Sequence, residues 1–218
     1  MRVTSLLISA ALGTSLFSAE PAKYPIDNDD VRVIDVTQDP HQKTKMHEHK
    51  PNRVMIYKAA GTQDIIFENG KKQVLKFRKN AVLWSPATGM HTSEVTSATP
   101  VPLVEIELKK PGAGKTVTSP LDPPKVDTKH YKVEFENDQV RVTRVKFGPH
   151  ETAPMHEHQL NRVIVYLTDS KTKITTAEGA VSETVRKAGE ILFQGGAKHT
   201  ETNTLDTPVE ILVTELKY

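Results

Sequence analysis

Hydrophobic residues along this chain occur in short runs that alternate with polar residues, which is the pattern of half-buried β-strands. Turn-forming sequences such as Glu68-Asn69-Gly70-Lys71 separate the runs. Beyond the N-terminal segment, no window of helical length shows a three-to-four residue period. Many short strands at regular spacing predict an all-β fold, either a sandwich or a barrel. The expected strands cover residues 31–36, 54–57, 65–67, 74–77, 82–84 and 103–108, then 140–145, 163–167, 174–176, 184–186, 191–193 and 211–216.

The second half of the chain repeats the first. Residues 135–142 match residues 26–33, and Asn52-Arg53 recurs as Asn161-Arg162 at an offset of 161 − 52 = 109 residues. A period near half the chain length indicates a duplicated domain rather than a solenoid. We therefore predict one domain over 24–109 and a second over 129–218. Between them, residues 110–128 are rich in proline and glycine and are expected to form a linker that joins neither a helix nor a central strand.

The N-terminus has the features of an export signal. Arg2 is followed by a mostly apolar stretch over 3–17 and by Ser18-Ala19, so residues 1–19 are predicted to be a signal peptide. An uncleaved anchor is the alternative, although the stretch is short for crossing a bilayer. Export would place the mature chain in the periplasm or outside the cell, without stable membrane association. The chain has no cysteine, which excludes a lipid anchor, a disulfide framework and thiolate ligands.

The charge balance gives no reason to expect a nucleic acid partner, because the formal net charge is only +2. Acidic and basic residues are interleaved. A mixture of acids, such as Glu105 and Glu107, with bases, such as those of segment 76–79, is typical of a solvated surface.

The histidines carry the strongest chemical signal. Eight of the nine fall into two copies of one pattern, with a constant offset of 109 up to the last histidine, where it becomes 199 − 91 = 108. Alternate residues of a strand share one face, roughly 7 Å apart, and imidazole nitrogens meet a metal ion at about 2.0–2.2 Å. Three such ligands leave coordination positions open for other molecules. The alternative is a set of hydrogen-bonded core histidines without metal. The predicted ligands are His47, His49 and His91 in the first copy and His156, His158 and His199 in the second.

His-x-His on one strand, a Gly/Pro-containing approach to a third histidine roughly forty residues later, and an all-β pattern resemble the cupin superfamily. With its duplication, the chain resembles a bicupin, over nearly all of the predicted mature chain. The resemblance implies two tandem antiparallel β-barrels of the jelly-roll type. The residues that carry it are Pro40, Met46, His47, Glu48, His49, Tyr57, Pro86, Gly89 and His91, then Pro149, Pro154, Met155, His156, Glu157, His158, Tyr166, Gly189, Gly195, Gly196 and His199.

The chain also departs from the cupin pattern. Cupins usually place a glutamate ligand after the second histidine, with three or four residues between the two, where this chain has Arg53-Val54 and Arg162-Val163. The site therefore resembles the three-histidine version of the cysteine dioxygenase branch. Three neutral imidazoles leave the charge of the ion uncompensated, which favours an anionic substrate or a bound hydroxide.

Several further residues have candidate roles around the metal. Arg53 and Arg162 are expected either to close a loop at the strand entrance or to bind a substrate carboxylate. His41 and His150 replace a glycine that cupins often carry, and we expect either a role near the metal or entrance or a plain rim position. The other candidates are Tyr57, Tyr166, Glu94 and Glu201, whereas Glu48 and Glu157 should point away from the metal, and Trp84 and Phe193 should belong to the core.

Taken together, these patterns predict an exported bicupin that binds up to two divalent transition metal ions (Fe, Mn, Ni, Cu or Zn) and a small organic molecule. The favoured activity is that of a metal-dependent dioxygenase or related oxidoreductase. A metal-dependent isomerase or lyase and a non-catalytic ligand- or metal-binding protein are the alternatives. Cupins often pair through their sheets, so a homodimer is a further expectation from the resemblance.

Overall fold

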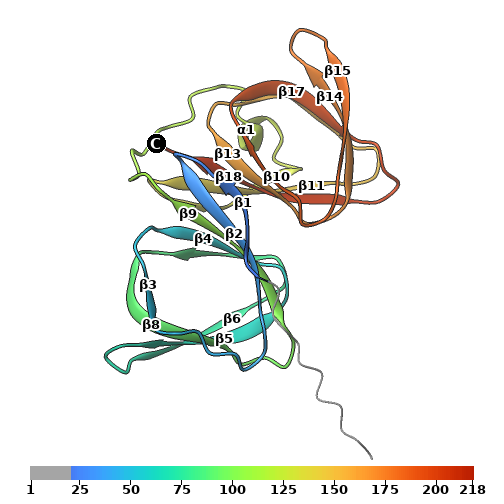
Figure 1. Cartoon of the computed structure of the whole chain (residues 1–218). Helices are drawn as coiled ribbons and strands as arrows, with labels where there is room; N and C mark the ends of the chain where they lie inside the picture. The colour runs from blue at the N-terminus through green and yellow to red at the C-terminus, as the bar shows by residue number, and fades with distance from the viewer. Residues whose placement is uncertain (1–20) are drawn as a thin grey trace, which may run out of the picture.

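The computed structural model describes residues 21–218, in which the strands form two copies of one antiparallel arrangement (Figure 1). The predicted signal peptide, 1–19, lies outside the described residues. The first copy contains β1 (Lys23–Asp27), β2 (Val31–Gln38), β3 (His47–His49), β4 (Arg53–Tyr57), β5 (Gly61–Phe67), β6 (Lys72–Phe77), β7 (Ala81–Ser85), β8 (Thr88–Val95) and β9 (Val101–Leu108). The second contains β10 (Tyr131–Glu136), β11 (Val140–Phe147), β12 (Thr152–His158), β13 (Arg162–Tyr166), β14 (Ser170–Thr176), β15 (Val181–Arg186), β16 (Ile191–Gln194), β17 (Ala197–Asn203) and β18 (Val209–Leu216).

Each copy folds into two sheets that face each other across a barrel. In the first copy the sheet orders are β1-β2-β9-β4-β7 and β3-β8-β5-β6, and in the second β10-β11-β18-β13-β16 and β12-β17-β14-β15. Alternate residues of each strand lie on opposite faces of its sheet, so the short apolar and polar runs of the sequence account for these strands. The fold is therefore all-β, with two tandem jelly-roll barrels as predicted.

Repeated side-chain hydrogen bonds set the first turn of each barrel. The Asn28 side-chain oxygen accepts from the backbone N–H groups of Asp30 and Val31. Asn137 does the same for Gln139 and Val140 in the second copy. Asparagine favours such local turns, so one sequence feature places two equivalent hairpins.

The linker contains a short helix that the sequence did not predict, and strands β1 and β10 were likewise absent from the expected strands. Helix α1 (Pro123–Val126) follows the buried Asp122 and packs on β10 and β12. The prediction that the prolines of this segment join no helix is wrong here, because proline is tolerated in the first turn, where its missing N–H has no helical partner. Nor is the linker detached from the barrel, since the Glu157 backbone N–H donates to the carbonyl of Leu121.

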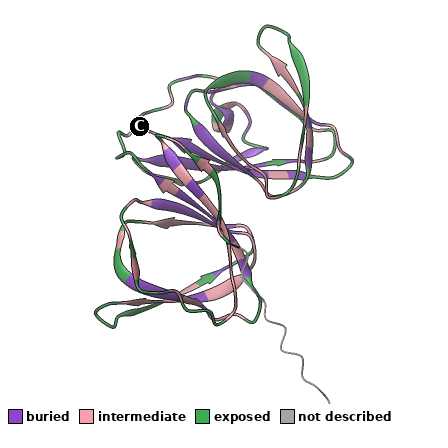
Figure 2. Ribbon diagram, in the orientation of Figure 1, coloured by how far each residue is buried: buried purple, intermediate pink, exposed green. Residues whose placement is uncertain are grey.

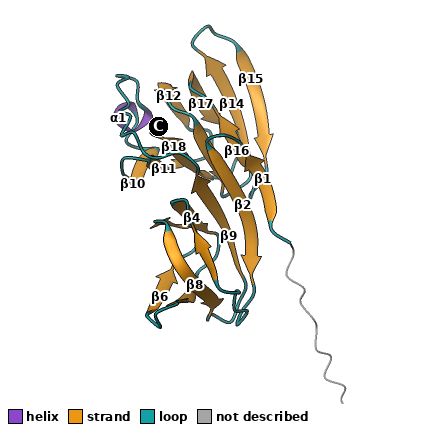
Figure 3. Ribbon diagram, turned by 60° about the vertical axis from the view of Figure 1, so that its left-hand side comes forward, coloured by secondary structure: helices purple, strands orange, loops and turns teal. Residues whose placement is uncertain are grey.

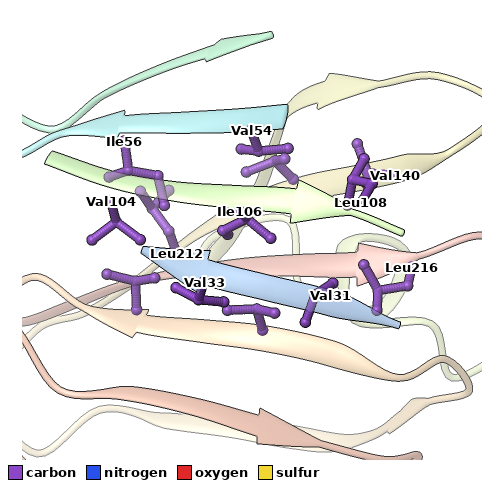
Figure 4. Packing of buried hydrophobic residues seen from close by; sticks show 13 residues of the cluster. Val31, Val33, Val54, Ile56, Val104, Ile106, Leu108, Val140, Leu212 and Leu216 are labelled. Atoms are coloured by element: carbon purple, nitrogen blue, oxygen red, sulfur yellow. The ribbon is translucent and has the colours of Figure 1, made fainter. Parts of the chain in front are cut away.

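The largest hydrophobic cluster lies between the two barrels. It joins Val54, Ile56, Val104 and Ile106 of the first five-stranded sheet to Val140, Val142, Leu212 and others of the second (Figure 4). The buried residues accordingly line the sheets where the barrels meet (Figure 2). Strand β1 also reaches across to lie beside β16 (Figure 3). Two smaller clusters lie inside the barrels, around Met55 and Leu103 in the first and around Ile164 and Ile211 in the second.

This packing buries both faces of the central strands and overturns one prediction. In β9, Val104 and Ile106 belong to the contact between the barrels, so Glu105 is on the opposite face, inside the first barrel. Glu105 is only 8% exposed, and the prediction that it belongs to a solvated surface is wrong. The homodimer stays a prediction.

Among residues 21–218, no helix is long and apolar enough to pass through a membrane.

Candidate metal centres

The three histidines of each copy meet because two neighbouring strands bring them into register. His47 and His49 are alternate residues of β3, and His47 is directly opposite His91 on β8. In the second barrel, His156 of β12 is directly opposite His199 of β17. We call His47, His49 and His91 the first triad, and His156, His158 and His199 the second triad.

In each triad, the three rings are close enough together to bind one ion. In each triad one nitrogen from every ring lies within 4.8 Å of the corresponding nitrogens of the other two. The Nε2 atoms of His47 and His49 are 3.1 Å apart. Two ligands at right angles, each about 2.1 Å from a metal, would be separated by about 3.0 Å. The spacing predicted from the sequence therefore produces the convergence that a metal site requires.

Backbone carbonyls orient several of the rings. The Nδ1 atoms of His47 and His91 are each 2.8 Å from a carbonyl oxygen two residues earlier in the chain. His156 repeats this contact with the carbonyl of Pro154 at 2.9 Å. A carbonyl oxygen can only accept, so Nδ1 carries the proton and the Nε2 lone pair is available to a metal. Such contacts fix the tautomer and the orientation of metal-binding histidines.

Burial favours the neutral, metal-binding form of five of the six imidazoles, those of His49, His91, His156, His158 and His199. It lowers the pKa of His49 to about 3 and that of His199 to about 3, with smaller contributions from neighbouring positive charges. Burial also lowers the pKa of His156 to about 4, although its hydrogen bond to Pro154 opposes the change. The residues present therefore fit a divalent transition metal, because three imidazole nitrogen donors suit such ions.

The metal-free protein should lose stability in mild acid. A histidine whose pKa falls on folding makes the unfolded chain take up protons first, so stability decreases as pH falls from about 6.5 towards 4. Glu201 acts in the opposite direction, because burial raises the pKa of its carboxyl to about 7. We expect a net loss on the order of 2 kcal/mol between pH 7 and pH 4, measured by urea unfolding after chelation. Glu201→Gln should steepen the loss, and a midpoint that rises on acidification would contradict the assignment.

Arg53 and Arg162 point into the barrels, and each is held by protein groups. Arg53 donates to Glu105 at 2.7 Å and to the hydroxyl of Ser85 at 2.9 Å. Arg162 donates to the carbonyl of Gly195 and to Gln194. Both arginines line the cavities beside their triads. The charge of Arg53 is balanced by Glu105, so Arg53 and Glu105 together add no net charge to the first cavity.

The sequence reasoning missed a carboxylate network behind the second triad. Glu215 Oε1 is 3.3 Å from Nδ1 of His158, and its Oε2 accepts from Arg141 at 2.6 Å. Arg141 also donates two hydrogen bonds to Asp122 of the linker, at 2.9 and 2.7 Å. The equivalent Glu107 of the first barrel is 4.0 Å from His49. The recurrence of this glutamate at an offset of 108 was the signal that could have identified it.

The remaining predicted residues lie in varied places. His41 and His150 occupy exposed turns with φ of 59°, the left-handed conformation that glycine favours, and neither lines a triad cavity. Tyr57 and Tyr166 do line the cavities beside the first and second triads. Other side chains follow expectation: Glu48 pairs with Lys50, Glu157 accepts from Ser119, and Trp84 stacks on Phe135 of the other barrel, although Trp84 also borders the first cavity.

The two triads open into very different spaces. The cavity beside the first triad has a volume of about 840 Å³, and its wall is mainly apolar, with Met55, Phe67, Leu75 and Leu83 among its residues. The cavity beside the second triad measures only about 60 Å³. Small-molecule sites typically have volumes of about 300–1,000 Å³. Only the first cavity is in this range.

Comparisons with known proteins agree with this architecture. Neither the known family models nor the curated protein sequences contain a match. Among solved structures, AerE from Microcystis aeruginosa is similar with a TM-score of 0.62 at 12% identity, over 91% of this chain and 98% of that one. The oxalate decarboxylase of Bacillus subtilis, a protein with Mn(II) centres, is similar with a TM-score of 0.61 at 11% identity, over 86% of this chain and 69% of that one. At such low identity the likeness concerns the fold, and the chain is therefore a bicupin in fold, with one histidine triad in each barrel.

Proposed function

We propose that this chain is an exported bicupin that uses a divalent transition metal in the first triad for the oxidation, such as dioxygenolysis, of a small organic molecule. The observation that carries the proposal is the large cavity beside three convergent imidazoles. A bound metal would supply Lewis-acid or redox activation in the positions that three histidines leave open. In dioxygenolysis, dioxygen is the oxidant and both of its atoms enter the product.

The cavity wall defines the kind of substrate. Most of the wall is apolar, which favours a molecule with a hydrophobic body. Because Glu105 neutralises Arg53, the charge of the metal is the dominant uncompensated charge in the site. An anionic oxygen donor, such as a phenolate, enolate or carboxylate, would bind at the metal. The hydroxyl of Tyr57 donates to Gln63 at 3.1 Å, which fixes two polar groups in the wall that can orient such a molecule.

A non-catalytic binding protein is the second candidate. One observation favours it: Glu105, the carboxylate among the residues that line the first cavity, is engaged by Arg53 and is not free to act as a base. An isomerase or lyase would need such a base, so that alternative has less support.

Oxygen consumption by the metal-loaded protein tests the proposal. We expect uptake with Fe(II)-loaded protein in the presence of hydrophobic phenols, enols or carboxylic acids, and loss of that uptake in the double variant His47→Ala/His49→Ala. Oxalate is a useful comparator, because the oxalate decarboxylase with a similar fold acts on it. Turnover is not expected here, since a small dianion gains nothing from the mainly apolar wall and the arginine of the cavity, Arg53, is already paired with Glu105. A fully metallated protein that binds such molecules without consuming oxygen would instead establish the binding function.

Export is the part of the proposal that rests on the sequence alone. Its support is the basic and apolar start of the chain over residues 2–17. Mature protein recovered from the periplasm or medium should begin near residue 20. Recovery of the intact N-terminus from the cytosol would contradict export.

A further inference from the structure

The two triads are alike, so the difference between their cavities arises from the surrounding residues. The three distances between ring centres are 4.9, 4.6 and 5.4 Å in the first triad and 5.3, 4.5 and 5.8 Å in the second. The cavities beside them nevertheless measure about 840 and 60 Å³. Some residue of the second barrel must therefore occupy the space that is open in the first.

Tyr131 is the residue that lies directly against the second triad. It is the first residue of β10, only 3% exposed, and its ring centre is 5.2 Å from that of His156. Its hydroxyl oxygen is 3.2 Å from Nε2 of His156. Because Nδ1 of His156 is tied to the carbonyl of Pro154, Nε2 is the atom available to a metal. The phenol thus points at the ligand atom itself.

The equivalent residue of the first barrel is Ala22. Lys132 is opposite Arg144 in the second barrel, and Lys23 is opposite Asp35 in the first, so the two registers correspond at an offset of 109. Tyr131 therefore corresponds to position 131 − 109 = 22. Ala22 lines the large cavity, with no side chain beyond its methyl group. The two copies of the repeat therefore differ at this position, which lines the cavity beside the triad in each barrel.

We propose that Tyr131 closes the second metal centre to incoming ligands, and that alanine at position 22 leaves the first centre open. The inference rests on the proposed function, since it requires that both triads bind metal. Its consequence is a division of roles. Substrate reaches the metal in the first barrel only, whereas the second triad, with the Glu215–Arg141–Asp122 network behind it, is a closed site that ties the linker to the barrel.

Azide binding to the Co(II)-loaded full-length chain tests the proposal without measuring activity. Two double variants isolate the sites: His156→Ala/His158→Ala keeps the first triad, and His47→Ala/His49→Ala keeps the second. Azide should change the visible Co(II) spectrum of the first variant. The second variant should bind azide at least about tenfold more weakly, because the phenol occupies the approach to the metal.

Reciprocal substitutions at the two equivalent positions supply the decisive comparison. Tyr131→Ala in the variant that keeps the second triad should create azide binding. Ala22→Tyr in the variant that keeps the first triad should weaken it at least about tenfold. Removing a buried aromatic ring is destabilising, so if Tyr131→Ala does not fold, Ala22→Tyr decides alone, since position 22 precedes an edge strand and tolerates change more readily.

The outcomes separate this inference from the proposed function. Equal azide affinity of the two isolated centres, or unchanged affinity in Ala22→Tyr, would overturn the role of Tyr131 while leaving the metal sites intact. Failure of both double variants to bind Co(II) would overturn the proposed function and this inference with it.

Discussion

Replacing His47 and His49 together by alanine is expected to lower the metal content of the loaded chain from two ions to one. The variant retains only His91 in the first barrel, and a single imidazole does not hold a divalent ion against water. The second triad is built entirely from residues of the other barrel, so its ion should remain. Elemental analysis after loading with Zn(II) or Co(II) and removal of excess metal measures the change, with circular dichroism to confirm that the β-structure is intact.

The matched control is the double variant His156→Ala/His158→Ala, which should also retain one ion. Under the proposed function, only the variant of the first triad loses oxygen consumption, because only that centre opens into a cavity of suitable size. Two ions retained in either variant would show that the triads are not the metal sites. Loss of both ions from a folded variant would show that the centres do not bind independently.

Replacing Arg141 by alanine is expected to lower the free energy of unfolding by about 3–5 kcal/mol, the usual cost of breaking a buried ion pair by removing one partner. Its guanidinium bridges Asp122 and Glu215, and the three side chains are 7%, 3% and 2% exposed. Without it, two buried carboxylates would lose their arginine, and Glu215 would keep only His158 and Asp122 only Lys125 as partners among the charged side chains described. Desolvation by burial lowers the pKa of Arg141, but the hydrogen bonds to Asp122 and Glu215 and the charges of these two carboxylates more than offset it, so the pKa is raised. Urea unfolding followed by circular dichroism measures the loss.

Arg32 provides the internal control, since it occupies the equivalent position of the first barrel (141 − 109 = 32). Its side chain is 41% exposed and lies 3.9 Å from Glu107, and its guanidinium is over the ring of Tyr24. An exposed pair of this kind contributes about 1 kcal/mol or less. Arg32→Ala should therefore be nearly as stable as the natural chain, and equal losses for the two arginine variants would refute the importance of burial.

The positions of the histidines in the two copies of the repeat predicted which residues form the candidate metal sites. Histidine spacing within a strand predicts which rings share a face, and the recurrence of the third histidine at nearly the same offset indicates the neighbouring strand. The structure places these residues together in both barrels. The positions at which the two copies differ were also informative. Ala22 in the first copy corresponds to Tyr131 in the second.

The carboxylates show where sequence reasoning failed. Glu105 alternates with Val104 and Ile106, and a half-buried strand with that pattern normally turns its acids to water. Here the apolar face packs against the other barrel, so the acid faces inward and meets Arg53. Glu215 also points inward from its strand and pairs with Arg141. Arg141 in turn pairs with Asp122 of the linker, and no local sequence pattern indicates that this linker residue packs against the barrel.

The sequence by itself determined the all-β fold, the duplication and the two sets of three histidines, because these depend on local alternation and on spacing along the chain. Only the tertiary structure decided which strand faces lie inside the barrels, which carboxylates neutralise the buried arginines, and that one triad opens into a cavity while Tyr131 fills the space beside the other. Alternation distinguishes the two faces of a strand but does not specify what covers each of them. That depends on contacts between residues far apart in the chain.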